Sequence, residues 1–153
     1  MDAKQKKWFF EIHQDLPRQG PGDFKSTQKA FLLMKDLPLR PKILDIGCGP
    51  GKQTLDLEKI SDCEIIAIDN HKPFLDELNQ EMKKQGVADR IDVRFGDMFN
   101  LDFYQESFDI VWSEGAIYNI GFEKGLASWK PYIKNDGFLA VTEACWLKLN
   151  PPK

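Results

Sequence analysis

The stretch of this sequence best suited to chemistry is a loop of alternating glycines behind an acid, Asp45-Ile-Gly-Cys-Gly-Pro-Gly51. Gly47, Gly49 and Gly51 lack a Cβ, so the backbone can take conformations that other residues avoid, and a ligand can come directly against the main chain. A helical pattern follows from Gln53, and its first N–H groups and positive dipole end favour a bound carboxylate. The sequence therefore predicts a ligand site at this loop.

Two common nucleotide-binding patterns do not fit the loop. The phosphate-binding pattern G-x-x-x-x-G-K-[ST] is absent, and the dinucleotide pattern G-x-G-x-x-G would need glycine at the position of Lys52. A nicotinamide-dependent oxidoreductase is therefore the weaker alternative, which a rise in melting temperature with NAD would support.

Further acids stand at the ends of predicted strands, as Asp45 does. Asp69 ends an apolar run about twenty residues beyond the loop, where an acid typically accepts hydrogen bonds from a ribose diol. Asp97 lies in Gly96-Asp97-Met98, at the end of the next run. Because ligands of open α/β sheets bind at the carboxyl ends of the strands, we expect these acids around one ligand.

The elements that would position these residues alternate along the chain. Short apolar runs predict strands at residues 42–46, 64–68, 91–95, 108–112 and 138–146. The first strand should begin after Pro41, and the third, with alternating polar residues, should lie at a sheet edge.

Helical spacing occupies most of the intervals between those runs. We predict helices at residues 26–37 with Ser26 as N-cap, at 53–60, from Pro73 to a C-cap at Gly86, and at 122–133 with a bend or restart at Pro131. Residues 135–137 should form a turn. The alternation predicts an α/β fold, a Rossmann-like, doubly wound and mostly parallel sheet with five strands present.

The chain of 153 residues is expected to form one domain. Within it, residues 1–38 would be an N-terminal helical cap and lid, and residues 39–153 the α/β core. The aromatic-rich residues 4–16 predict an amphipathic helix, interpreted mainly as core cover, and residues 16–22 predict a lid because their prolines and glycines forbid a helix.

Composition excludes several classes of function. An apolar share of 42% and a charged share of 29% are those of a globular protein, and a net charge of −3 provides no basic surface for nucleic acid. No run is long enough to span a membrane, and no cysteine or histidine grouping predicts a metal site. Three widely spaced cysteines, Cys48, Cys63 and Cys145, predict a reduced, cytoplasmic setting.

The glycine loop resembles the nucleotide loop of class I S-adenosylmethionine-dependent methyltransferases, [DE]-x-G-x-G-x-G, and the order of strands and acids is similar to theirs over most of residues 40–146. Asp102 stands at a position where many members of that family have proline. The segments that resemble the small-molecule branch related to quinone-biosynthesis methyltransferases are Gly96-Asp97, Asn100-Leu-Asp-Phe103, Ser107-Phe-Asp-Ile-Val111 and Ser113-Glu-Gly115, while Trp112 to Phe122 resembles a bacterial subgroup of unknown acceptors.

The resemblance implies S-adenosylmethionine as cofactor and a small-molecule methyl acceptor. It places Gly47, Gly49 and Gly51 beneath the methionine and ribose parts of the cofactor, with Asp45 near its amino group. Glu114 would border the methyl group.

At the nucleoside end, the resemblance implies that Asp69 holds the ribose hydroxyls and that Asn70 lies beside the adenine. Asp97, after Gly96 and together with the Met98 backbone, would recognise the adenine edge.

The implied chemistry asks little of side chains. A sulfonium activates its own methyl group, so in-line transfer mainly requires donor and acceptor held at near-attack distance with water excluded, which contributes up to roughly 7–11 kcal/mol. A base is needed only where the acceptor must lose a proton. Glu114 and Tyr118 are the candidates, with His13 and His71 behind them.

The end of the chain bears on what this domain would do. Members of the family usually complete the sheet with two more strands, so we expect an incomplete domain that binds cofactor while turning over weakly. Its fifth strand would expose an apolar edge, to be covered by missing polypeptide, by the N-terminal segment, or by a second copy in a homodimer. A non-catalytic cofactor-binding or interaction module is the alternative from a different class.

Overall fold

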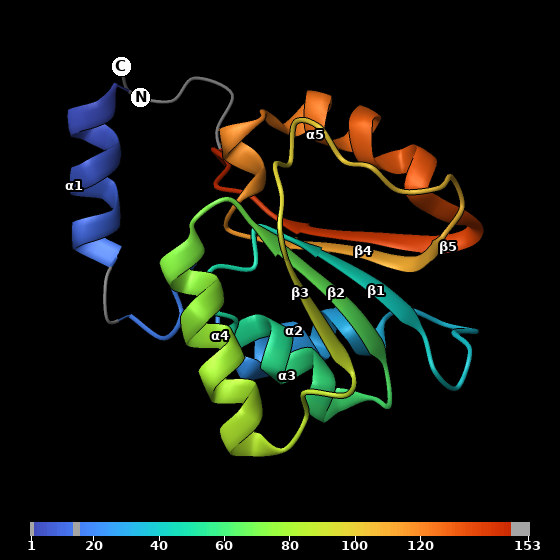
Figure 1. Cartoon of the computed structure of the whole chain (residues 1–153). Helices are drawn as coiled ribbons and strands as arrows, with labels where there is room; N and C mark the ends of the chain where they lie inside the picture. The colour runs from blue at the N-terminus through green and yellow to red at the C-terminus, as the bar shows by residue number, and fades with distance from the viewer. Residues whose placement is uncertain (1, 14–15, 148–153) are drawn as a thin grey trace.

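The computed structural model describes residues 2–13 and 16–147, and its centre is a parallel sheet of five strands. The strand order is β3-β2-β1-β4-β5, so the chain starts in the middle and winds outward in both directions (Figure 1). The strands are β1 (Lys42–Ile46), β2 (Glu64–Asp69), β3 (Ile91–Phe95), β4 (Phe108–Glu114) and β5 (Ile133–Thr142). The predicted α/β class and the edge position of the third strand are confirmed.

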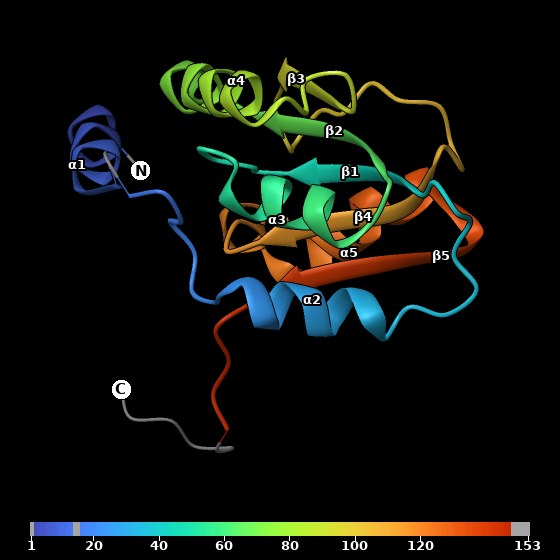
Figure 2. The same cartoon turned by 90° about the horizontal axis from the view of Figure 1, so that it is seen from below.

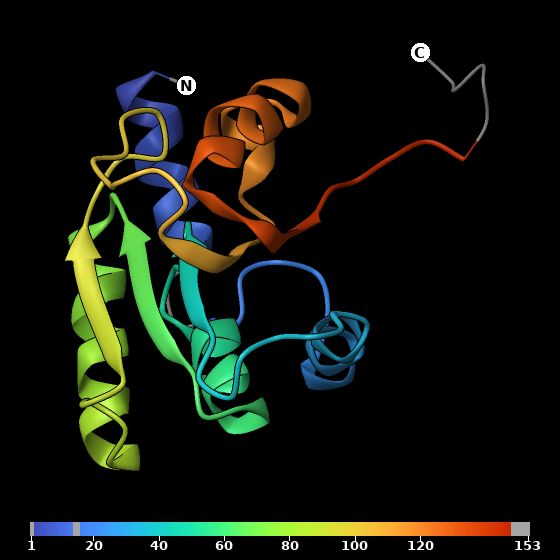
Figure 3. The same cartoon turned by 90° about the vertical axis from the view of Figure 1, so that its right-hand side faces the viewer.

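Helices cover both faces of the sheet (Figure 3). One face carries α2 (Phe24–Leu32), α3 (Lys52–Ile60) and α4 (Lys72–Gln85); the other carries α5 (Phe122–Trp129) with the short turns η1 (Ile117–Asn119) and η2 (Lys130–Tyr132). A further helix, α1 (Ala3–His13), stands beside the end of the sheet toward which the strand arrows point (Figure 2). None of the helices within the described ranges is long and apolar enough to cross a membrane.

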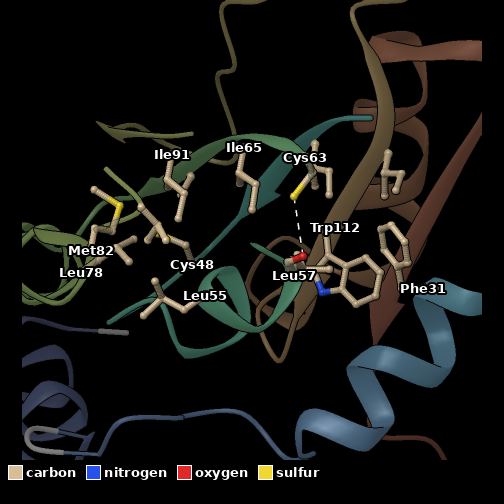
Figure 4. Packing of buried hydrophobic residues seen from close by; sticks show 14 of the residues in the cluster. Phe31, Cys48, Leu55, Leu57, Cys63, Ile65, Leu78, Met82, Ile91 and Trp112 are labelled. Carbon is tan, nitrogen blue, oxygen red and sulfur yellow. Dashed lines mark hydrogen bonds between the residues drawn. The ribbon is translucent and has the colours of Figure 1, made fainter. Parts of the chain in front are cut away.

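Each face of the sheet has its own core. Side chains of α2, α3 and α4 pack on one face, where Trp112 and Phe31 lie at one end of the cluster and Leu78 and Met82 at the other (Figure 4). The second cluster centres on Phe108, Val111 and Trp129. Burial on both faces explains why β1 and β4 read as nearly continuous apolar runs.

Three predicted helix boundaries were wrong. The N-cap of α2 is Asp23 and not Ser26, because the Asp23 carboxylate accepts the backbone N–H of Ser26 at 2.8 Å. That helix ends at Leu32 rather than at residue 37. The helix predicted at residues 122–133 restarts at Pro131 as expected, because α5 ends at Trp129 and the 3₁₀ turn η2 follows, but it ends one residue too late, since Ile133 already begins β5.

The predicted turn at residues 135–137 lies inside β5. Ile133 pairs with Phe108 and Phe138 with Ile110, so four residues of β5 bulge opposite the single residue Asp109. Lys134 donates to the Asp109 carboxylate at 2.8 Å, which anchors the bulge. The strand then ends at Thr142, and the predicted continuation to residue 146 was wrong.

Candidate functional site

A cavity of about 610 Å³ lies where β1, β2 and β4 end, between the glycine loop and the N-terminal segments. It opens at the carboxyl ends of the strands, the usual position of ligand sites in such sheets. It is lined by Phe10, His13, Gln19, Gly20, Gly47, Cys48, Gly49, Pro50, Gln53, Asp69, Asn70, Phe74, Met98, Phe99, Glu114, Gly115, Ala116, Tyr118 and Asn119.

The glycine loop is fixed by the neighbouring strand. The N–H groups of Gly47 and Cys48 both donate to the carbonyl of Ile68, at 2.9 and 3.0 Å. The Gly49 N–H donates to Oδ2 of Asp69 at 2.9 Å. The acid that ends β2 therefore holds the turn and also lines the cavity.

Asp69 accepts a backbone hydrogen bond on each of its carboxylate oxygens. Its other oxygen, Oδ1, accepts the backbone N–H of His71 at 2.8 Å. Burial raises the pKa of Asp69, while the hydrogen bonds from Gly49 and His71 act in the opposite direction. Each oxygen keeps a lone pair for a second donor, such as a ligand hydroxyl.

Two of the three glycines border the cavity and the third is a packing residue. A Cβ on Gly47 would lie 2.5 Å from Cβ of Ala116, and one on Gly49 would meet the Gln19 amide at 3.4 Å. Gly51, with φ +86°, turns toward α4 instead: its Cβ would lie 2.2 Å from Cδ1 of Leu78.

Asp45 lies beneath the loop and outside the cavity lining. It is fully buried, and its Oδ2 accepts the Thr54 hydroxyl at 2.6 Å while Oδ1 has no partner among the described residues. Burial raises the pKa of Asp45 to about 7, although the Thr54 hydrogen bond opposes the shift. This carboxyl group therefore keeps its proton to a much higher pH than an exposed aspartate does.

Glu114, at the end of β4, accepts three side-chain hydrogen bonds. Oε1 receives the Thr27 hydroxyl at 2.8 Å and the Trp112 indole N–H at 2.9 Å. Oε2 receives Nη1 of Arg18 at 2.7 Å. Residues of three separate parts of the chain thus meet on one buried carboxylate.

Only some of the residues that were predicted to bind the nucleoside line the cavity. Asn70 and Met98 line the cavity, whereas Gly96 packs against Ile68 and Asp97 is exposed. Oδ1 of Asp97 accepts the Phe99 N–H at 3.0 Å, so this acid shapes the turn that carries Met98 and Phe99.

Of the base candidates, Glu114, Tyr118 and His13 line the cavity and His71 does not. His71 stacks on Phe10 of α1 with ring centroids 3.6 Å apart, and its burial lowers the pKa of the imidazole. Tyr118 is half exposed at the rim.

Sequence reasoning passed over several lining residues. Gln53 is buried and donates its amide to the Cys48 carbonyl at 2.8 Å, and its place directly after the glycine loop was the available signal. The aromatic wall from Phe10 and Phe74 carried no signal beyond ordinary packing. Across residues 2–13 and 16–147, no group of three or more His, Cys, Asp or Glu side chains is arranged to hold a metal ion.

The sequence matches a family model and several curated proteins. A family model described as a methyltransferase domain matches residues 43–137. Sterol 24-C-methyltransferase of Candida albicans is 31% identical over 87 residues, covering 57% of this chain and 23% of the relative. Demethylmenaquinone methyltransferase of Lactiplantibacillus plantarum is 32% identical over 92 residues, covering 59% of this chain and 39% of the relative.

The chain thus spans well under half of the length of these curated relatives. Among solved structures, the geranyl diphosphate C-methyltransferase of Streptomyces coelicolor, in complex with S-adenosyl-L-homocysteine, superposes with a TM-score of 0.64 at 17% identity. The match covers 76% of this chain and 45% of that one, and it shows a shared fold.

Proposed function

This chain belongs to the methyltransferase domain family, whose model matches more than half of it, and on that premise we propose that it binds S-adenosylmethionine and transfers the methyl group to a small molecule. The observation that carries the proposal is the Asp69 carboxylate, held by the Gly49 N–H at the end of β2 and facing the cavity. The fold relative with bound S-adenosyl-L-homocysteine supports the same ligand class.

The residues present fit such a cofactor. A cavity of about 610 Å³ lies within the usual range for ligand sites, roughly 300–1,000 Å³. Asp69 offers acceptors to a ribose diol, and Gly47 and Gly49 keep the main chain open to the ligand. Phe10 and Phe74 supply apolar surface at the same end, which suits an adenine ring.

We assign Asp69 to the ribose, Asn70 and the Met98 backbone to the adenine, and the loop at Gly47 and Gly49 to the ribose and methionine parts. Gly96 and Asp97 contribute to adenine binding indirectly, because they form the turn that places Met98 at the cavity. Gly51 and Asp45 support the loop from below, with Asp45 near the amino group, and Glu114 borders the methyl group.

When bound, the cofactor supplies a methyl group already activated by its sulfonium. The chain would contribute orientation and exclusion of water, which are worth up to roughly 7–11 kcal/mol in well-aligned transfers. An acceptor that must lose a proton would need a base within hydrogen-bond reach. Of our two candidates, Tyr118 at the open rim is better placed than Glu114, whose oxygens already accept three donors.

Calorimetry with S-adenosylhomocysteine tests the cofactor assignment directly. We expect binding, together with a rise in melting temperature that NAD does not produce. Stabilisation by NAD alone would refute the proposal in favour of an oxidoreductase.

Turnover is tested by screening small metabolites for methyl transfer from labelled S-adenosylmethionine. We expect at least one labelled product. Cofactor binding without any labelled product would support a non-catalytic binding module instead.

We also propose a homodimer formed through the edge of β5, which is the last strand of the sheet and whose Leu139 and Val141 are only partly buried. A second copy would pair with the open edge. Sedimentation showing a monomer at micromolar concentration would refute this arrangement. A cytoplasmic location is proposed because Cys48, Cys63 and Cys145 are all free thiols.

A further inference from the structure

One arginine ties the segment of residues 16–23 to two different elements of the site. Nη1 of Arg18 lies 2.7 Å from Oε2 of Glu114 at the end of β4, and Nη2 lies 2.6 Å from Oδ2 of Asp56 on α3. The two carboxylates are 7% and 1% exposed and Arg18 is 13% exposed, so the ion pairs are shielded from water.

Backbone packing reinforces this attachment. A Cβ on Gly115 would lie 2.9 Å from Cα of Gly20, so the segment and the turn after β4 are in direct contact. Gln19 reaches the glycine loop, where its amide oxygen would lie 3.4 Å from a Cβ on Gly49. Gln19 and Gly20 consequently form part of the cavity wall.

Resting on the proposed function, we propose that Arg18 is the positioning residue of the cofactor site, and that Glu114 serves as its anchor and not as a general base. Arg18 holds residues 16–23 as a fixed wall between the glycine loop and β4. Cofactor affinity then depends on a contact that involves no cofactor atom.

The hydrogen bonds of Glu114 support the role of anchor. A base must offer a lone pair to the acceptor's proton, whereas three of the roughly four lone-pair positions of the Glu114 carboxylate already accept hydrogen bonds, from Thr27, Trp112 and Arg18.

The geometry requires the forked guanidinium. Arg18 uses separate nitrogens for Glu114 and Asp56, and one of these carboxylates, Asp56, has a second cation because Oδ1 contacts Lys52 Nζ at 2.8 Å. A lysine at position 18 would bring a single ammonium and could not reproduce the two-sided contact.

The test compares the dissociation constant for S-adenosylhomocysteine in R18M, R18K and E114Q. We expect a rise of at least tenfold in each, including R18K, which should fold because it keeps the positive charge. A glutamine at position 114 must direct its NH2 group at one of the three donors, so E114Q breaks the anchor without changing side-chain size. The dissociation constant of the double variant R18M/E114Q should exceed that of the weaker-binding single variant by no more than about threefold, because both substitutions remove the same contact.

R90M provides the matched control. Arg90 also pairs with a buried carboxylate of α3, Glu58, but does not line the cavity. It should lower the melting temperature while the affinity for S-adenosylhomocysteine stays within about twofold. A tenfold loss of affinity in R90M would show that Arg18 acts only through general stability and would overturn the proposal.

Hydrogen exchange gives a second readout that does not need ligand. The amides of Ser26 and Thr27, which donate to Asp23 at the end of this segment, should exchange faster in R18M and E114Q than in the wild type, with R90M unchanged. Unaltered exchange and affinity in both variants would overturn the proposal. If the wild type itself fails to bind S-adenosylhomocysteine, the proposed function fails, whereas the exchange experiment still decides whether Arg18 fixes the segment.

Discussion

Replacing Gly51 by alanine should destabilise this domain through a clash with one buried leucine. Gly51 has φ +86°, and an added Cβ would lie 2.2 Å from Cδ1 and 2.8 Å from Cδ2 and Cγ of Leu78. Leu78 is fully buried in the cluster between the sheet and α4, so it has little room to move away. Gly86 is the matched control, because it has φ +71° and no atom within 4 Å of an added Cβ.

The magnitude follows from two separable costs. A left-handed backbone costs an alanine roughly 1–2 kcal/mol, and this applies to both glycines. Reduced freedom of the unfolded chain returns about 0.4–1 kcal/mol to both variants. Only Gly51→Ala adds overpacking, which typically costs about 1–3 kcal/mol. The difference between the two variants should therefore be about 1–3 kcal/mol in the free energy of unfolding.

Urea denaturation followed by tryptophan fluorescence and circular dichroism would measure both variants. A third comparison, Gly51→Ala in the background of Leu78→Ala, should show favourable coupling of at least 1 kcal/mol, because the truncated side chain no longer meets the new methyl group. Equal unfolding free energies for Gly51→Ala and Gly86→Ala would refute the packing role of Gly51.

Three further changes probe the site. Asp69→Ala should weaken binding of S-adenosylhomocysteine by about 1.5–3 kcal/mol, measured by calorimetry, and unchanged affinity would remove Asp69 from the site. Because burial raises the pKa of Asp45 from 3.8 to about 7, the folded state holds the proton more tightly than the unfolded state, and the unfolding free energy should fall as pH rises between these values. Asp45→Asn should flatten that part of a urea-stability profile, and an unaltered slope would contradict the assignment. Gly115→Ala should raise the dissociation constant by displacing Gly20, whereas Gly121→Ala, which also places an alanine at positive φ but has open space around it, should not; equal effects would refute the close contact.

Local signals were sufficient for most of the fold. Helix α4 has the predicted limits because Pro73 lies in its first turn and Gly86 ends it in the left-handed conformation. The central strands were predictable because burial on both faces leaves continuous apolar runs. The start of α2 was missed because Asp23 and Ser26 are both good caps, and only the fold decides between them.

Long-range contacts limited the prediction of the site. The sequence could indicate the glycine loop and Asp69, which lie on consecutive elements of one βαβ unit. It could not indicate that Arg18 meets Asp56 and Glu114, because those partners are 38 and 96 residues away along the chain. An ion pair across such separations leaves no periodic pattern.

Side chains along β1 point alternately to the two faces of the sheet, and this explains why Asp45, the acid before the glycines, lies under the loop. Leu44 and Ile46 belong to the core cluster on the α5 face, and Ile43 to the cluster on the α3 face. Asp45 shares the orientation of Ile43, since side chains two residues apart in a strand point to the same face. Its carboxyl group therefore meets Thr54 of α3 and not the cavity. Any influence of Asp45 on a ligand must then pass through the loop that it supports, or through its charge at a distance, and the raised pKa makes that charge depend on pH close to neutrality.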